Sequence, residues 1–157
     1  MIIGVAVGAA IFTPPAAAAP PTHYPIAFPY STVLTDVCSF PVNLDGIVNG
    51  TGIDYFDKSG ALTRSSWHVE QQDTFSAYGK TLVGIPYHTS IEFLFDSSGN
   101  LTKMYGSGVF EKIPLPDGSL FVSAGRAEFV QRGAVILLSP DKGNPGNLAG
   151  FCAALTS

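Results

Sequence analysis

Apolar and polar residues alternate with a period of two along much of the chain. In the segment 87–95, apolar residues and threonine occupy one set of alternate positions, while the other set includes His88 and Glu92. Successive side chains of a β-strand point to opposite faces, so this pattern is typical of a strand with one buried side. Segments 61–70 and 121–129 show the same pattern. The pattern therefore predicts a sheet with an apolar core face and a charged outward face.

Turn residues separate the alternating segments. We predict strands, rich in β-branched and aromatic residues, at 39–48, 52–57, 61–75, 81–95, 101–113, 119–130 and 134–138. Between them, turns of Asn, Asp, Pro and Gly are predicted at 49–50, 57–60, 78–80, 96–99, 116–118, 132–133 and 140–143. Asp accepts hydrogen bonds from the backbone of its own turn, and Gly adopts the left-handed conformation that closes the turn. Only the segment 148–155 suggests a short helix.

One turn phrase occurs twice. The segments 56–64 (FDKSGALTR) and 95–103 (FDSSGNLTK) share six of nine residues. In addition, glycines 60, 79, 99 and 118 are spaced by 19, 20 and 19 residues, which fits long strands paired in sequential order. Antiparallel strands without covering helices must close on themselves or pack as two sheets. We therefore predict an all-β fold, a single antiparallel, calycin-like β-barrel of about six to nine strands, with a two-sheet β-sandwich as the alternative.

The N-terminal segment lacks charged side chains and is strongly apolar. An apolar run at 2–12 is followed by two prolines and four alanines. This order is typical of a secretory signal with an A-x-A cleavage site, and the run is shorter than the ~20 residues of a membrane span. We predict a signal peptide at 1–19, a proline-rich extended leader at 20–36 and a β-barrel domain at 37–157. No Lys or Arg precedes the run, which indicates either a true start upstream of Met1 or an unusually weak signal. An apolar N-terminus on a cytosolic protein is the alternative.

Composition narrows the classes of partner. Twelve acidic and eight basic residues give a net charge of −4, and the basic residues are scattered. Nucleic-acid binding depends on clustered Lys and Arg, so we predict no nucleic-acid partner. At 157 residues, with 46% hydrophobic residues, the chain is long enough for one domain with a sizeable core. We also predict that the mature chain has no membrane span.

Two cysteines, Cys38 and Cys152, lie near the ends of the predicted domain. An even pair in an exported protein indicates a disulfide, which we expect to join the first and last strands. A zinc site needs further ligands, and a redox pair needs a closer spacing such as C-x-x-C. The cysteines therefore predict a structural disulfide in a secreted protein, and we predict neither a metal nor a cofactor.

The charged face carries the side chains best suited to chemistry. We predict that six residues share it: His68, Glu70, His88, Glu92, Arg126 and Glu128. Two imidazoles and three carboxylates on neighbouring strands would suit an acid–base pair or a metal site. The alternative is a solvated face with ordinary cross-strand pairs. No G-x-S-x-G, H-E-x-x-H or phosphate-binding loop occurs, so no catalytic residue is assigned.

Three functions remain open at this point. The first is a secreted, non-enzymatic protein that holds an apolar or amphipathic small molecule in the mouth of the barrel. Its lining would be Trp67, Tyr87, Phe93 and Phe129. The second is a cell-envelope structural or interaction protein without a small ligand. The third is a hydrolase- or cyclase-like enzyme that uses the His and Glu residues of the charged face.

Several short motifs recur together in one known group of proteins. They include VCSFPV at 37–42, LPDGSLF at 115–121, LSPDKG at 138–143 and FCAAL at 151–155, together with the D-x-S-G-x-L-T turn. With these motifs the segment 37–155 resembles a family of uncharacterised, secreted, β-rich actinobacterial proteins, and the paired cysteine ends are the most specific part. The resemblance implies export and a small β-rich domain, and it brings no catalytic residues.

Overall fold

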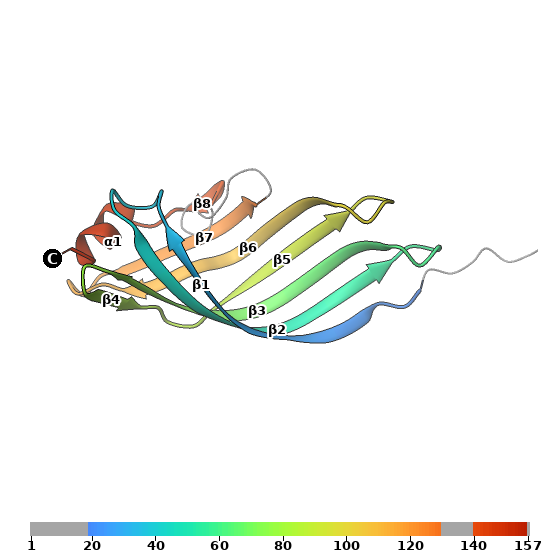
Figure 1. Ribbon diagram of the computed structural model, residues 1–157, viewed down its shortest axis with the longest axis horizontal. Coiled ribbons are helices and arrows are strands. Elements are labelled where there is room, and N and C mark those ends of the chain that lie inside the picture. Colours follow the sequence, from blue (N-terminus) through green and yellow to red (C-terminus); the bar gives the residue numbers. More distant parts are fainter. Residues whose placement is uncertain (1–18, 130–139, 157) are drawn as a thin grey trace, which may run out of the picture.

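Eight strands and one short helix make up residues 19–129 and 140–156, the part of the chain that this computed structural model describes (Figure 1). The elements are β1 (Thr22–Leu34), β2 (Val42–Phe56), β3 (Leu62–Ala77), β4 (Lys80–Val83), β5 (Tyr87–Phe95), β6 (Leu101–Pro114), β7 (Leu120–Glu128), β8 (Lys142–Asn144) and α1 (Leu148–Ala154). The predicted strand at 134–138, the predicted turn at 132–133 and nearly all of the predicted signal peptide lie outside the described residues. The predicted short helix at 148–155 is present as α1.

All eight strands belong to a single antiparallel sheet. Their order is β1-β2-β3-β5-β6-β7-β8, and β4 pairs with β3 beside this path. The all-β prediction is therefore confirmed. The predicted barrel is wrong, because the sheet is not closed: among the described residues β1 pairs only with β2, and β8 only with β7. Closure requires the first and last strands to pair. The described strands also do not form two separate sheets, because hydrogen-bonded pairing joins all of them.

The segment predicted as an extended leader contains the whole of β1, which is an edge strand. β1 pairs with β2 from Thr22 opposite Asp54 to Leu34 opposite Val42. Its sequence contains two prolines within the paired region. Proline has no N–H to donate and is tolerated at sheet edges, where it also hinders the addition of a further strand. Residues 22–34 of this segment are therefore an integral strand of the sheet.

One continuous strand, β2, replaces two predicted strands and the turn predicted at Asn49-Gly50. Gly50 lies within β2, opposite Val69 of β3. A Cβ atom at this position would clash with the carbonyl oxygen of His68 and with Val69. The Asn-Gly pair therefore marks a close approach between two strands, which is a second use of glycine in sheets.

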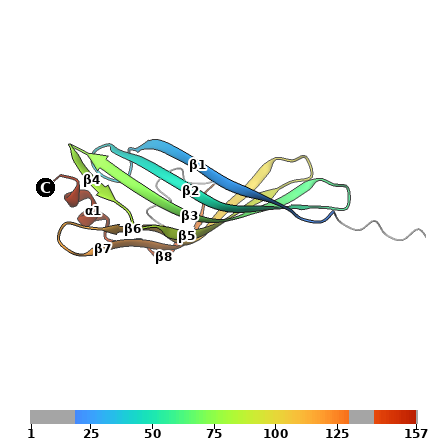
Figure 2. The same ribbon diagram turned by 90° about the horizontal axis from the view of Figure 1, so that it is seen from below.

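The sheet divides into two layers where β3 separates from β5. These strands pair from Arg64 opposite Leu94 to Gln71 opposite Tyr87, and the end of β3 pairs instead with β4. The strand predicted at 81–95 is consequently split into β4 and β5. We call this division the fork. On the side of the fork where β3 pairs with β4, strands β1–β4 lie across from β6 and β7 (Figure 2).

The main hydrophobic core fills the space between the two layers. Phe151 of α1 contacts both Phe75 of β3 and Phe121 of β7, with ring centroids 5.1 and 5.3 Å apart, and all three are buried. The predicted disulfide between Cys38 and Cys152 is present. It does not join the first and last strands as expected, because it links the β1–β2 connection to α1. The helix and the disulfide together close the core at this end of the molecule.

The repeated turn phrase forms two hairpin tips at the opposite end (Figure 1). Asp57 Oδ1 accepts hydrogen bonds from the backbone N–H groups of Ser59 and Ala61, at 2.8 and 3.0 Å. Asp96 makes the equivalent bonds, both 2.9 Å long, to the residues two and four positions later. The glycine three positions after each Asp has a φ of +84° or +80°. The predicted Asp–Gly turns are confirmed at both positions.

Candidate functional site

The sheet has two faces, which the strand register separates. Residues directly opposite each other in an antiparallel pair share a face. Glu70 lies opposite His88, and His68 lies opposite Ser90. Val69, between the two rows, points the other way and is buried. We call the face with the histidines the outer face and the face with Val69 the inner face.

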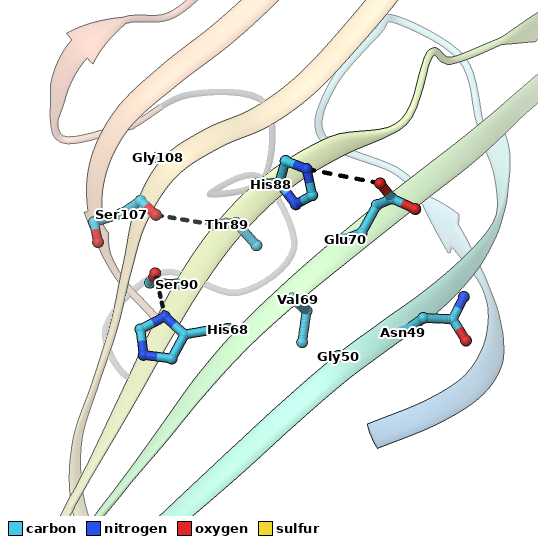
Figure 3. Close-up of a pocket in the computed structure, with 10 residues that line it drawn as sticks. All are labelled: Asn49, Gly50, His68, Val69, Glu70, His88, Thr89, Ser90, Ser107 and Gly108. Carbon is cyan, nitrogen blue, oxygen red and sulfur yellow. Dashed lines mark hydrogen bonds and ion pairs between the residues drawn. The ribbon is translucent and has the colours of Figure 1, made fainter. Parts of the chain in front are cut away.

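Three of the six predicted polar residues meet in a hollow of about 390 Å³ on the outer face, the polar hollow (Figure 3). His68 Nδ1 lies 3.0 Å from Ser90 Oγ, and His88 Nε2 lies 3.7 Å from Glu70 Oε2. The side chains of His88 and Glu70 are 82% and 54% exposed. The complete lining is Asn49, Gly50, His68, Val69, Glu70, His88, Thr89, Ser90, Ser107 and Gly108. Each imidazole therefore has its own partner at an open surface.

The other three predicted polar residues lie elsewhere on the outer face. Glu92 forms an ion pair with Arg64 at 3.3 Å. The guanidinium of Arg126 lies 4.7 Å from the ring centroid of Tyr105, which is opposite Glu128 in the register of β6 and β7. Tyr105, Arg126 and Glu128 help to line a separate hollow of about 240 Å³, to which Glu92 does not contribute. Nowhere in the described residues do three His, Cys, Asp or Glu side chains come together in a way that could hold a metal ion.

A larger hollow adjoins the polar hollow on the same face. It has a volume of about 630 Å³ and includes Ile47 and Val83, which are 55% and 54% exposed. We call it the apolar hollow; its lining is Pro29, Tyr30, Ser31, Asp45, Gly46, Ile47, Gln72, Thr74 and Val83. Ile47 precedes Asn49 of the polar hollow by two residues along β2. The two hollows therefore follow one another on the outer face, an arrangement that the sequence did not predict.

The four aromatic residues predicted to line a ligand cavity lie at three separate places. Trp67 contacts Phe93, with ring centroids 4.8 Å apart. Phe129 packs edge-on against Phe110 at 6.3 Å. Tyr87 is buried at the fork. Because the sheet is not closed, these side chains do not face one shared lumen.

A group of polar side chains is enclosed at the fork, and we call it the buried polar cluster. Its members are Tyr30, Gln71, Asp73, Tyr87, Glu111 and Ser123. Asp73 is fully buried and accepts hydrogen bonds from the Tyr30 hydroxyl on one oxygen and from the Tyr87 hydroxyl, at 2.7 Å, on the other. The Gln71 amide donates a further bond of 3.1 Å. Burial is the main cause that raises the pKa of both tyrosines, so both hydroxyls keep the proton that they donate.

Glu111 is the second carboxyl of the buried polar cluster. It is fully buried, and it lies opposite Ser123 in the pairing of β6 with β7. Neither oxygen of Glu111 has a regular hydrogen-bond partner among the described residues, and the same holds for the Ser123 hydroxyl. Burial, followed by the charge of neighbouring Asp73, raises the pKa of Glu111 well above its usual value. Glu111 therefore keeps its proton to a higher pH than an exposed glutamate does, and it is enclosed in the interior of the protein.

Glycines of β2 allow tyrosines of β1 to reach across it to β3. Tyr30 lies opposite Gly46, which in turn lies opposite Asp73. With no side chain at Gly46, the Tyr30 ring passes over β2 and its hydroxyl reaches Asp73. The arrangement recurs at Tyr24, whose hydroxyl oxygen accepts the indole N–H of Trp67 at 2.9 Å across a second glycine. The glycine positions thus connect three strands through side chains.

Replacing Gly46 by Ala is expected to lower the free energy of unfolding by about 2–3 kcal/mol. The added Cβ would clash with the Tyr30 ring and with Asp73 Oδ1, so the tyrosine must move and its hydrogen bond must weaken. Urea denaturation followed by circular dichroism measures the change. The matched control is Thr51→Ala, an exposed position on the outer face of the same strand, where we expect a change below about 0.5 kcal/mol. Equal losses in both variants would contradict the assigned role of Gly46.

Comparison with known proteins found no protein family, no curated protein and no solved structure that matches this chain. Within the described residues, no helix has the length and apolar character that a bilayer crossing requires.

Proposed function

We propose that this protein is an exported, non-enzymatic binding protein that holds its partner on the outer face of its open sheet. The observation that supports the proposal is the pair of adjoining hollows on this face, with volumes of about 390 and 630 Å³. Small-molecule sites are concave and typically measure about 300–1,000 Å³. The partner we propose is a component of the cell envelope, which an exported protein meets first.

The chemistry of the polar hollow favours binding over catalysis. Ser90 and His68 form a hydroxyl–imidazole contact, but the described residues supply no carboxylate that orients the His68 ring. His88 pairs with Glu70 in a separate contact at an exposed surface. An activated nucleophile needs a base that a third group holds in place. The enclosed carboxyls Asp73 and Glu111 do not open onto either hollow as acid or base, because both are fully buried.

The proposal of export has one structural support. A disulfide joins Cys38 to Cys152. Such bonds form and persist in oxidising compartments, which fits an extracellular or cell-envelope location. The apolar segment at 2–12 is consistent with the same route. Membership of the secreted actinobacterial family stays a prediction.

Native mass spectrometry of the protein purified from its own host tests this function. We expect a fraction of the molecules to carry a non-covalent partner that is absent after denaturation. A variant with Ile47→Gln and His88→Ala should lose this added mass, because one substitution changes each hollow. The matched control is Val33→Gln, which changes a 52% exposed side chain of the same face that lines neither hollow. A wild-type protein without added mass, or an equal loss in the control, would count against the proposal.

A further inference from the structure

We infer that the two hollows form one site for an amphipathic small molecule. Its uncharged, hydroxyl-rich headgroup lies in the polar hollow and its aliphatic portion lies in the apolar hollow. This inference rests on the proposed function and names the class of ligand. It follows from the hydrogen-bonding side chains of the polar hollow and from the exposed aliphatic side chains of the apolar hollow. The succession of the two hollows along β2 and β3 and the edge strand beside them also support it.

The polar hollow offers donors and acceptors without a dominant charge. Ser90 and Asn49 can both donate and accept hydrogen bonds, as can a neutral imidazole through its two nitrogens. The lining holds a single carboxylate, Glu70, and no Lys or Arg, and one oxygen of Glu70 lies 3.7 Å from Nε2 of His88. Hydroxyl groups, which also donate and accept, suit this mixture better than a strongly charged headgroup does.

The apolar hollow exposes aliphatic side chains to solvent. More than half of the surface of Ile47 and of Val83 is accessible, at 55% and 54%. The amide of Gln72 at the same hollow is held in place, because its nitrogen donates to the carbonyl oxygen of Gly84 at 3.0 Å. Covering aliphatic surface is favourable in proportion to the area removed from water. An aliphatic chain is the ligand portion that covers Ile47 and Val83, beside the exposed polar side chains of Ser31 and Asp45 in the same hollow.

The two hollows together match an elongated molecule. From Asp45 at one end to Thr51 beyond the other, β2 rises by roughly 20 Å, at about 3.3 Å per residue. A polypeptide that adds a strand is a poorer candidate for this region. The neighbouring edge strand β1 carries Pro25 and Pro29, which hinder the backbone pairing that strand addition requires.

Isothermal titration calorimetry with n-dodecyl-β-D-maltoside below its critical micelle concentration tests the inference on the full chain. This detergent joins an uncharged sugar headgroup to an aliphatic chain, and maltose supplies the headgroup alone. We expect saturable binding of the detergent and at least about tenfold weaker binding of maltose. Ile47→Gln should weaken detergent binding about tenfold, and His88→Ala should weaken it about threefold to tenfold. Val33→Gln should change the affinity less than about twofold.

Several results would overturn the inference. Equal weakening by Ile47→Gln and Val33→Gln would indicate non-specific adsorption of the chain. Equal affinity for dodecyl sulfate would show that the polar hollow does not select an uncharged headgroup. If the protein from its host carries a partner that depends on the outer face but fails to bind the detergent, the ligand class is wrong and the proposed function stands. If the added mass is a polypeptide, the ligand class is also wrong and the proposed function also stands. If the protein carries no partner and does not bind the detergent, both proposals are contradicted.

Discussion

Replacing both Cys38 and Cys152 by Ser is expected to lower the free energy of unfolding by about 3–5 kcal/mol. The disulfide closes a loop with a sequence separation of 114 residues, and a loop of this length restricts the unfolded chain strongly. In the folded state it also holds the β1–β2 connection against α1, whose Phe151 contacts Phe75 and Phe121 across the core. Urea denaturation of the variant and of the wild type, under oxidising and reducing conditions, measures the change.

Two probes show whether the loss affects the whole molecule. Trp67 is the only tryptophan and lies on the part of the sheet between the fork and the hairpin tips, so its fluorescence reports a region distant from the disulfide. We expect the fluorescence and circular-dichroism transitions of the variant to coincide, as in a cooperative domain. Ser39→Ala, beside Cys38, is the matched control and should shift stability by less than about 0.5 kcal/mol. A loss below about 1 kcal/mol in the double variant would contradict the assigned role of the bridge.

Replacing Glu111 by Gln is expected to stabilise the protein as the pH rises above the ordinary glutamate pKa of about 4.3, and to reduce the pH dependence of its stability. The folded state holds the Glu111 proton because burial, followed by the charge of Asp73, raises the pKa. The unfolded state releases this proton at the ordinary glutamate pKa of about 4.3. As the pH rises between these two pKa values, the wild type therefore loses up to about 1.4 kcal/mol of stability per pH unit. Gln has no proton to lose and nearly the same shape.

Urea denaturation at about pH 4.5 and about pH 8 distinguishes the two proteins. The difference in stability between Glu111→Gln and the wild type should be small at the lower pH and large at the higher pH. Glu70→Gln, at an exposed position on the outer face, is the matched control and should follow the wild-type curve. Parallel curves for Glu111→Gln and the wild type would show that the folded protein releases this proton at an ordinary pH.

Local features of the fold could be predicted from the sequence. Whether the sheet closes into a barrel could not. The hairpin tips follow from Asp57 and Asp96, because the bonds that form each turn lie within five residues. The barrel prediction was wrong because strand pairing between distant segments decides whether a sheet closes. β3 exchanges its partner from β5 to β4 after Gln71, and this divides the sheet in a way that no local pattern records. Gly50 resembles a turn residue in sequence, and its clash with β3 becomes visible only once the strands are paired.

The candidate site, too, could be predicted from the sequence only in part. The alternation correctly places His68, Glu70 and His88 on one face, since two-residue periodicity survives along regular strands. Asp73 lies an even number of residues from Trp67 and Val69, so it shares their face of β3. This spacing could have predicted that the Asp73 carboxyl is buried. Glu111 gave no such signal. An irregular pairing between Val109 and Glu111 shifts the alternation of β6 and turns its carboxyl into the interior.

The central claim, that the ligand lies on the outer face of an open sheet, is tested most directly by chemical-shift mapping. The measurement is a ¹⁵N–¹H spectrum of the full chain titrated with n-dodecyl-β-D-maltoside below its critical micelle concentration. We expect the largest changes at the amides of Ile47, Asn49, Glu70 and His88, with little change at the indole N–H of Trp67. Changes concentrated at the Trp67 indole and at Phe93, with the outer-face amides unaffected, would place the ligand on the inner face and contradict the claim.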